Sequence, residues 1–122
     1  MKYLCLIYDE EKNLAALSGG DREALMGEYF AFTEAIRNSG HYLAGEALQS
    51  VQSATTVRIR NGRLSTTDGP FAETKEQLGG FYLIDARDLN EAIQLASRIP
   101  SARLGCVEVR PVREARRSRS GN

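Results

Sequence analysis

Four ionisable side chains within ten residues make the segment 68–77 the part of the chain best suited to chemistry. It reads Asp-Gly-Pro-Phe-Ala-Glu-Thr-Lys-Glu-Gln, and its polar candidates are Asp68, Glu73 and Lys75. A carboxylate removed from water has a raised pKa and can act as a base near neutral pH. A neighbouring ammonium group can hold an anionic or carbonyl ligand. Because Gly69-Pro70 marks a turn, the alternative is that Asp68 holds this turn while the other charges lie in water.

One histidine and three aromatic side chains complete the candidate set. His41 is the only histidine, and its unperturbed pKa lies near neutrality. Tyr8 and Tyr82 stand in strand-like segments and can present hydroxyls to a cleft, while Phe71 can form its wall or anchor the turn to the core. The hypothesis is a pocket where the segment 68–77 meets the central strands. Its catalytic candidates are Asp68, Glu73 and His41, and its ligand-binding candidates are Tyr8, Phe71, Lys75 and Tyr82.

Several other kinds of site are excluded by the motifs that the chain lacks. There is no Gly-x-Gly-x-x-Gly, no Walker A motif and no Gly-x-Ser-x-Gly elbow. One histidine and two distant cysteines, Cys5 and Cys106, cannot make an ordinary zinc site within one chain. Both cysteines stand in apolar, strand-like segments, which predicts buried and inert thiols rather than a redox pair. We expect no cofactor and no metal.

Length and charge suit one domain of the ordinary globular class. The chain has 122 residues, of which 42% are hydrophobic and 26% charged. Residues 113–122 hold four arginines and one glutamate, whereas residues 1–112 hold 12 basic and 15 acidic side chains. We therefore expect a domain over 1–112, a disordered basic tail over 113–122, and no nucleic acid as partner. No apolar run is long enough to cross a membrane and no signal peptide is evident, so the predicted location is cytoplasmic.

Two amphipathic helices are predicted between strand-like segments. Asp21 is a suitable helix cap, Gly40 a suitable end, and the apolar residues between them recur at helical spacing. Asp88 and Glu91 have the spacing of a capping box for a second helix that Pro100 stops. The inward faces of these helices are formed by Leu25, Tyr29, Phe32 and Ile36 in the first, and by Leu89, Ala92, Ile93, Ala96 and Ile99 in the second. Strands are predicted at 3–8, 41–47, 81–84 and 105–112, and loops at 9–20 and 49–54.

A β-hairpin is the clearest local prediction. Asn61-Gly62 separates two strand-like segments, 55–60 and 63–67, and this dipeptide favours a two-residue turn. Val57 and Ile59 alternate with arginines, so one side of the hairpin is expected to be buried and the other wet.

The order strand, helix, strand, hairpin, strand, helix, strand predicts an α+β fold. It is the split βαβ plan of the ferredoxin-like fold with an inserted β-hairpin. Two helices can cover only one face of such a sheet, yet residues 3–8 and 81–84 are apolar on both faces. A second copy of the chain is the simplest cover for the other face, so we expect a homodimer.

Several segments together resemble the DGPF-domain branch of the YCII-related family. These are the Asp-Gly-Pro-Phe-Ala-Glu-Thr-Lys-Glu at 68–76, the Gly-Gly-Phe-Tyr at 79–82, and the segments 1–8, 99–102 and 107–112. The resemblance spans residues 1–112 and implies a dimeric α+β barrel. In the smaller YCII-like proteins a histidine–aspartate pair is proposed as the active site, with the histidine in the first helix. Here Tyr29 stands near that position, so such a pair is not evident.

Three functions remain open at this point. The protein could be a small-molecule enzyme that uses acid–base chemistry in a pocket beside the segment 68–77. It could bind a small metabolite in the same pocket without catalysis. It could also be a regulatory or interaction protein, because the resemblance implies a link to extracytoplasmic-function sigma factors. A buried Asp68 or Glu73 in a closed cavity would favour the first two functions, and an exposed apolar patch would favour the third.

Overall fold

A computed structural model describes residues 1–114 as a mixed α+β structure with two antiparallel sheets. In chain order the elements are β1 (Lys2–Asp9), α1 (Glu11–Ala15), α2 (Gly19–Asn38), β2 (Tyr42–Ala47), the 3₁₀ helix η1 (Val51–Ser53), β3 (Thr55–Arg60), β4 (Arg63–Asp68), β5 (Gln77–Asp85), α3 (Leu89–Ala96), the 3₁₀ helix η2 (Pro100–Ala102) and β6 (Cys106–Pro111). The larger sheet has the order β2-β5-β1-β6, and all its neighbouring strands are antiparallel. The predicted α+β class is confirmed.

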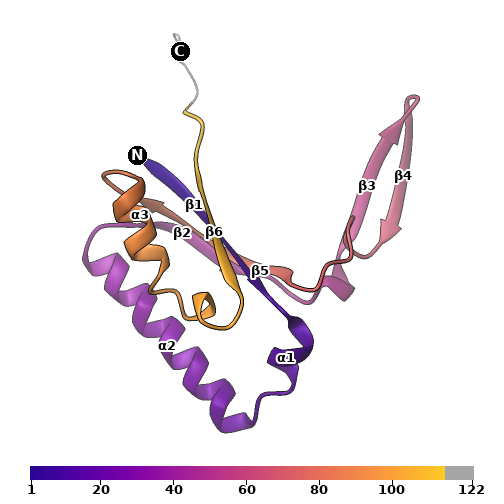
Figure 1. Ribbon diagram of the computed structural model, residues 1–122. Helices are drawn as coiled ribbons and strands as arrows, with labels where there is room; N and C mark the ends of the chain where they lie inside the picture. Colours follow the sequence, from indigo (N-terminus) through magenta and orange to yellow (C-terminus); the bar gives the residue numbers. More distant parts are fainter. Residues whose placement is uncertain (115–122) are drawn as a thin grey trace.

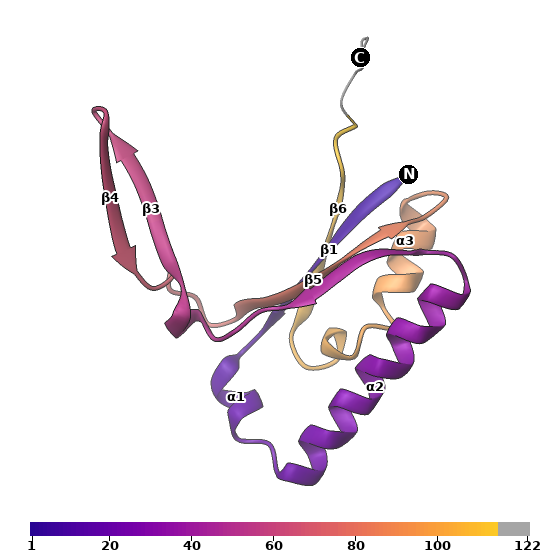
Figure 2. The same ribbon diagram turned by 180° about the vertical axis from the view of Figure 1, so that it is seen from behind.

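Helices α2 and α3 lie on the same face of the larger sheet, and the β3–β4 hairpin projects away from it (Figure 1). The reverse view shows the opposite face of the sheet without a helix over it (Figure 2). The core therefore lies between the sheet and these two helices. We call the uncovered side the open face.

The two central strands alternate between these faces. In β1, the side chains of Tyr3, Cys5 and Ile7 are buried toward the helices, whereas Leu4 and Leu6 are half-buried on the open face. In β5, Gly80, Tyr82 and Ile84 are buried, whereas Phe81 and Leu83 between them are half-buried. As expected from two helices, only one face of the sheet is covered within residues 1–114, and the cover of the open face by a second copy stays a prediction.

The first long helix begins earlier than predicted. Ser18 is its cap and its hydroxyl accepts the N–H of Asp21 at 3.0 Å, so α2 starts at Gly19. The predicted inward residues Phe32 and Ile36 are buried, and Gly40 follows the helix with a left-handed φ of 81°. The predicted loop 9–20 contains the short helix α1, which the scattered apolar residues of that segment did not indicate.

The second helix and the last strand follow the prediction more closely. Asp88 caps α3, because its carboxylate accepts the N–H of Glu91 at 2.9 Å. Of the predicted inward stripe, Ala92, Ala96 and Ile99 are buried, whereas Leu89 and Ile93 stay about half exposed. In β6, both valines pack against the core.

The predicted hairpin is present, but its apolar side is not buried. Asn61 and Gly62 have φ values of 54° and 74°, the positive pair that a two-residue turn of the favoured type requires. The side chains of Val57 and Ile59 are 60% and 64% exposed. The prediction of a buried side is therefore wrong for the single chain, because the hairpin stands apart from the sheet and helices (Figures 1 and 2).

Two further predictions concern chain ends and membranes. From residue 115 onward, the segment expected to be disordered lies outside the described residues. Over residues 1–114, none of the helices has the length and apolar character needed to cross a bilayer.

Candidate functional site

A buried carboxylate at the end of β1 is the most unusual polar group in the core. Asp9 continues the helix-facing series of Tyr3, Cys5 and Ile7, and it is only 7% exposed. Its Oδ2 accepts the hydroxyl of Ser101 at 2.9 Å, whereas its buried Oδ1 has no hydrogen-bond partner among residues 1–114. A buried polar atom without a partner is costly, which makes Oδ1 a candidate contact for a ligand.

Asp9 is the end of a short hydrogen-bonded chain that joins three elements. The hydroxyl of Tyr29, on the inner face of α2, lies 2.5 Å from the hydroxyl of Ser101 in η2. Serine has one hydroxyl hydrogen. Because Ser101 donates that hydrogen to Asp9, the phenol of Tyr29 must be the donor to Ser101. The three groups therefore form one hydrogen-bonded chain in the order Tyr29, Ser101, Asp9.

The electrostatic surroundings hold Asp9 toward its neutral form. Burial raises the pKa of Asp9, the Ser101 hydroxyl lowers it in part, and the nearby Glu76 charge raises it further. Burial also raises the pKa of Tyr29, with a contribution from the charge of Asp9. A carboxyl group with a raised pKa can give and take a proton closer to neutral pH than an exposed aspartate does.

The segment 68–77 reaches this carboxyl only at its far end. Gln77 opens β5 directly opposite Asp9, and Glu76 accepts the thiol hydrogen of Cys106 at 3.5 Å. Cys106 is exposed, so the prediction of a buried thiol is wrong for it, since its side chain lies on the open face of an edge strand. Desolvation and Glu76 raise its pKa. Cys5 is buried as predicted, and burial raises its pKa to about 11.

The remaining candidates of this segment lie in more open positions. Asp68 ends β4 and is exposed, and Glu73 is exposed as well. No hydrogen bond or ion pair within the described part of the chain joins them, so their convergence stays a prediction. Phe71 is 80% exposed, which contradicts its predicted role as an anchor in the core, because it lies in the connection between β4 and β5. Lys75 lines an open hollow of about 290 Å³ together with Glu10, Lys12, Thr74 and Gln77.

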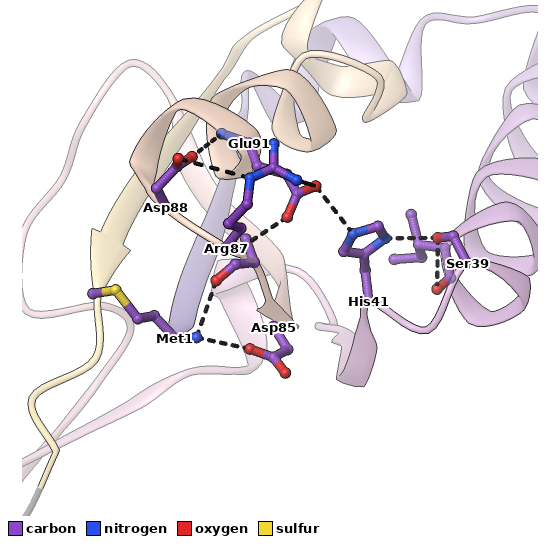
Figure 3. A network of polar contacts seen from close by, with 9 residues as sticks. Met1, Ser39, His41, Asp85, Arg87, Asp88 and Glu91 are labelled. Carbon is purple, nitrogen blue, oxygen red and sulfur yellow. Dashed lines mark hydrogen bonds and ion pairs between the residues drawn. The ribbon is translucent and has the colours of Figure 1, made fainter.

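His41 belongs to a different region, between the end of α2 and the start of α3 (Figure 3). Its Nδ1 lies 2.7 Å from the Ser39 hydroxyl, and its Nε2 lies 3.6 Å from Glu91 Oε2. Arg87 holds the same carboxylate through its backbone N–H at 2.8 Å and its guanidinium at 3.1 Å. The hollow beside His41 and the hollow beside Lys75 have no lining residue in common, so these two candidates do not share a pocket.

This region is a network of ion pairs that joins the residue before β2 to the residues that follow β5. The backbone N–H of Arg87 lowers the pKa of Glu91, and the charges of Arg87 and His41 lower it further against the effect of desolvation. The N-terminal ammonium group of Met1 is paired with Asp85 at 2.9 Å in the same hollow (Figure 3). Each charged side chain of the network thus already has a partner.

The two candidate tyrosines lie on opposite faces of the sheet. Tyr82 is buried toward the helices, where its hydroxyl lies 2.6 Å from that of Thr33. Its ring meets Phe32 edge to face, with the two ring centres 5.2 Å apart. Tyr8 lies on the open face, and its hydroxyl donates to Glu108 at 3.4 Å. The structural alternative of an aromatic core with a satisfied hydroxyl therefore describes Tyr82.

Asp9 and Ser101 were not among the candidates that the sequence indicated. The signal for Asp9 is the alternation of Tyr3, Cys5 and Ile7, which places the ninth residue on the same buried face. The role of Ser101 depends on where η2 meets β1, and spacing along the chain does not reveal such a contact. Among residues 1–114, no group of three or more histidine, cysteine, aspartate or glutamate side chains could hold a metal ion.

Comparisons with known proteins agree with the resemblance at the level of the family. The YCII-related domain matches residues 1–116. An uncharacterized protein of Rhizobium meliloti (strain 1021) is 38% identical over 114 residues, covering 92% of each chain. A 5-chloro-2-hydroxyhydroquinone dehydrochlorinase from Burkholderia phenoliruptrix AC1100, in complex with 2,5-dihydroxybenzoquinone, matches 94% of this chain and 96% of its own, with a TM-score of 0.54. Its sequence is 15% identical, so this likeness concerns the fold alone. The chain belongs to the YCII-related family.

Proposed function

We propose that the protein is an enzyme that transfers protons on a small molecule, with Asp9 as the acid–base residue. The observation that carries this proposal is the buried Oδ1 of Asp9, which has no hydrogen-bond partner among the described residues. Burying one oxygen of a carboxyl group without a hydrogen bond lowers stability, and such groups are typical of functional sites. The relative that matches most of the chain and the DGPF-like segments support the family, but they do not identify the reaction.

The geometry supports a two-way proton transfer at Oδ1. In the neutral form this oxygen can donate a proton to a carbonyl or hydroxyl oxygen of the ligand. In the ionised form it can accept one from an acidic O–H or C–H group. Ser101 donates to Oδ2 in both cases and stabilises the carboxylate, and Tyr29 supports Ser101 from behind. Tyr29 stands near the position of the helix histidine in the smaller relatives, so a phenol takes the place of an imidazole beside the aspartate.

We propose that a ligand approaches the carboxyl group past Gly79, on the side of Oδ2. A Cβ atom at this glycine would meet no atom within 4 Å except Asp9 Oδ2, which lies 4.0 Å away. Space beside the carboxyl group is thus left open by the missing side chain. The hollow lined by Gln77 and Lys75 begins on the same stretch of chain, and Lys75 could hold an anionic part of the ligand.

The dehydrochlorinase that shares the fold suggests a first ligand to test. It was solved with 2,5-dihydroxybenzoquinone, a ring that carries both hydroxyl and carbonyl oxygens. Such a ring offers one donor and one acceptor to a carboxyl group that can play either part. We therefore propose small hydroxylated or carbonyl compounds as the substrate class.

The test is calorimetric titration of the protein with 2,5-dihydroxybenzoquinone. The wild type should bind it, and Asp9→Asn should bind it at least about tenfold more weakly, since a lost contact to a charged group is worth more than 1.4 kcal/mol. Glu23→Gln, an exposed carboxyl group of α2, is the matched control and should bind as the wild type does. Equal binding by the wild type and Asp9→Asn would contradict the proposal.

The catalytic roles predicted for Asp68, Glu73 and His41 are tested in the same titration. Asp68→Asn and Glu73→Gln change exposed carboxyl groups and should leave the fold intact. If they abolish binding while Asp9→Asn does not, the site belongs to the segment 68–77 as the sequence suggested. Ligand binding without turnover would favour the second function, a metabolite-binding module.

We also propose that the protein is a homodimer in which the open faces of two sheets meet. The strand order β2-β5-β1-β6, with α2 and α3 each joining two of its strands, supports the split βαβ plan of the dimeric α+β barrel. Leu4, Leu6, Phe81 and Leu83 are half-buried apolar residues of the open face. Analytical ultracentrifugation at micromolar concentration should give a mass of twice 13.5 kDa, and a stable monomer would contradict this proposal.

A further inference from the structure

The β3–β4 hairpin carries an exposed apolar strip that its own chain does not cover. The strip consists of Val57, Ile59 and Leu64, whose side chains are 60%, 64% and 68% exposed. Ile59 and Leu64 are direct partners across the two strands, and Val57 lies two residues before Ile59, so all three share one face. A continuous apolar strip of this kind on an otherwise soluble element marks a contact surface.

The opposite face of the hairpin is basic. Arg58 stands across from Ser65, and Arg60 stands across from Arg63. The hairpin 55–68 contains these three arginines and one acidic side chain, Asp68 at its root, whereas the other residues of 1–112 contain nine basic and fourteen acidic side chains. The hairpin is therefore electrostatically complementary to the remainder of the same chain.

The root of the hairpin is fixed, which makes it an arm with a defined direction. The N–H of Gly69 donates to the carbonyl of Ala54 at 2.7 Å, and the Thr56 hydroxyl donates to the carbonyl of Gly69 at 2.8 Å. The carboxylate of Glu11 accepts from the Ser50 hydroxyl at 2.8 Å and from the Val51 N–H at 3.0 Å. Helix α1 thus holds the connection that leads into β3, and a preorganised arm loses little entropy on docking.

We propose that this arm docks its apolar strip on a second copy of the chain. A second copy offers an acidic body for the three arginines, and its side chains next to the contact between the two open faces cover the strip. In a twofold dimer each arm reaches the other copy, so the contact is made twice and both strips are buried together. The inference rests on the proposed homodimer and is independent of the acid–base function of Asp9.

The test compares two arginine substitutions on opposite faces of the arm. Ile59→Arg places a charge in the strip, and Ser65→Arg places the same charge on the basic face as a matched control. Sedimentation equilibrium should give a dimer dissociation constant that is at least about tenfold higher for Ile59→Arg than for Ser65→Arg, because a buried isoleucine is replaced by an unpaired charge. Both variants should fold, since both side chains are exposed in the single chain.

Excision of the arm provides a second variant. Because Ala54 and Gly69 already meet through a hydrogen bond, residues 55–68 can be replaced by a short glycine bridge. The shortened chain should dimerise more weakly than the wild type, to a similar degree as Ile59→Arg. If both variants dimerise as strongly as the wild type, the proposed contact of the arm is wrong and only the contact between the sheets remains. A monomeric wild type would overturn the homodimer itself, and binding of 2,5-dihydroxybenzoquinone would still report on Asp9 separately.

Discussion

At the scale of single residues, the environment of Asp9 favours the protonated form of its carboxyl group. Burial raises the pKa of Asp9 above the ordinary value of 3.8. At pH values between 3.8 and this raised pKa, the folded protein therefore keeps a proton that the unfolded chain has lost. Asp9 therefore costs stability as the pH rises through this window, and the cost persists above it.

The first prediction follows from this fall in stability with rising pH. Asp9→Asn removes the titration, so the stability of the wild type relative to Asp9→Asn should fall as the pH rises above 3.8. The change amounts to about 1.4 kcal/mol for each tenfold change in the proton-dissociation constant. Urea unfolding of both proteins from about pH 3 to pH 8 measures it. A difference that stays constant, or grows in favour of the wild type with rising pH, would refute the raised pKa.

Glu91 should behave in the opposite way. The N–H of Arg87 and the charges around it lower the pKa of Glu91, so its contribution to stability is present above 4.5 and is lost as the pH falls through the lowered value. Glu91→Gln should therefore reduce the melting temperature at pH 7 and have less effect at strongly acid pH. Glu23→Gln, on the exposed side of α2, is the control. An equal loss at both pH values would show that Glu91 acts through packing.

Residue types alone led to His41, Asp68 and Glu73, because titratable side chains in loops are conspicuous in a sequence. The structure instead buries a carboxyl group that the sequence analysis assigned to the start of a loop. Tyr29 was noted for its position in the first helix, but its link to Asp9 passes through Ser101. Ser101 lies 72 residues after Tyr29 along the chain. Contacts at this separation depend on the packing of helix on sheet, and residue spacing does not encode them.

At the scale of elements, close contacts between backbone segments hold the sheet together near the site. A Cβ atom at Gly105 would lie 2.0 Å from the carbonyl oxygen of Tyr8, whereas a Cβ atom at Gly27 in α2 would meet nothing within 4 Å. Gly105→Ala should destabilise the protein by about 3 kcal/mol or more, because β6 must move away from β1. Gly27→Ala should stabilise it by about 0.5–1 kcal/mol. Thermal unfolding of the two variants would contradict this account if their effects were alike.

Gly79 tests the proposed route to Asp9. Gly79→Val places a side chain in the open space beside the carboxyl group, and the glycine does not have a left-handed φ that would strain the valine. The variant should stay folded by circular dichroism and bind 2,5-dihydroxybenzoquinone at least about tenfold more weakly. Binding at the wild-type level would mean that the ligand approaches from another side.

Local signals predicted the elements well wherever one residue type dictates the geometry. Asn61-Gly62 predicted the hairpin turn, Gly40 the end of α2, and Asp88 the start of α3. Helix α1 was missed, since five residues give too short a pattern to separate a helix from a turn. The start of α2 was placed at Asp21 because glycines normally disfavour a helix, yet the Ser18 cap draws Gly19 into its first turn.

At the scale of the whole molecule, the order of elements predicted the α+β class, and the apolar central strands predicted that the sheet would have one face without cover. The position of the hairpin could not be predicted in the same way. Alternation along 55–60 requires that one side meets something apolar, but it does not say whether that partner is the same chain or another. Because the hairpin stands apart from the sheet of its own chain (Figure 1), we propose a second copy as that partner.

The most direct test of the central claim is a carbon NMR titration of the side-chain carboxyl groups, with the Asp9 signal assigned by its loss in Asp9→Asn. We predict that the Asp9 signal titrates above 3.8, and that 2,5-dihydroxybenzoquinone shifts it while leaving the signals of Asp68 and Glu73 unchanged. An Asp9 signal that titrates at or below 3.8 and does not respond to this ligand would contradict the acid–base site.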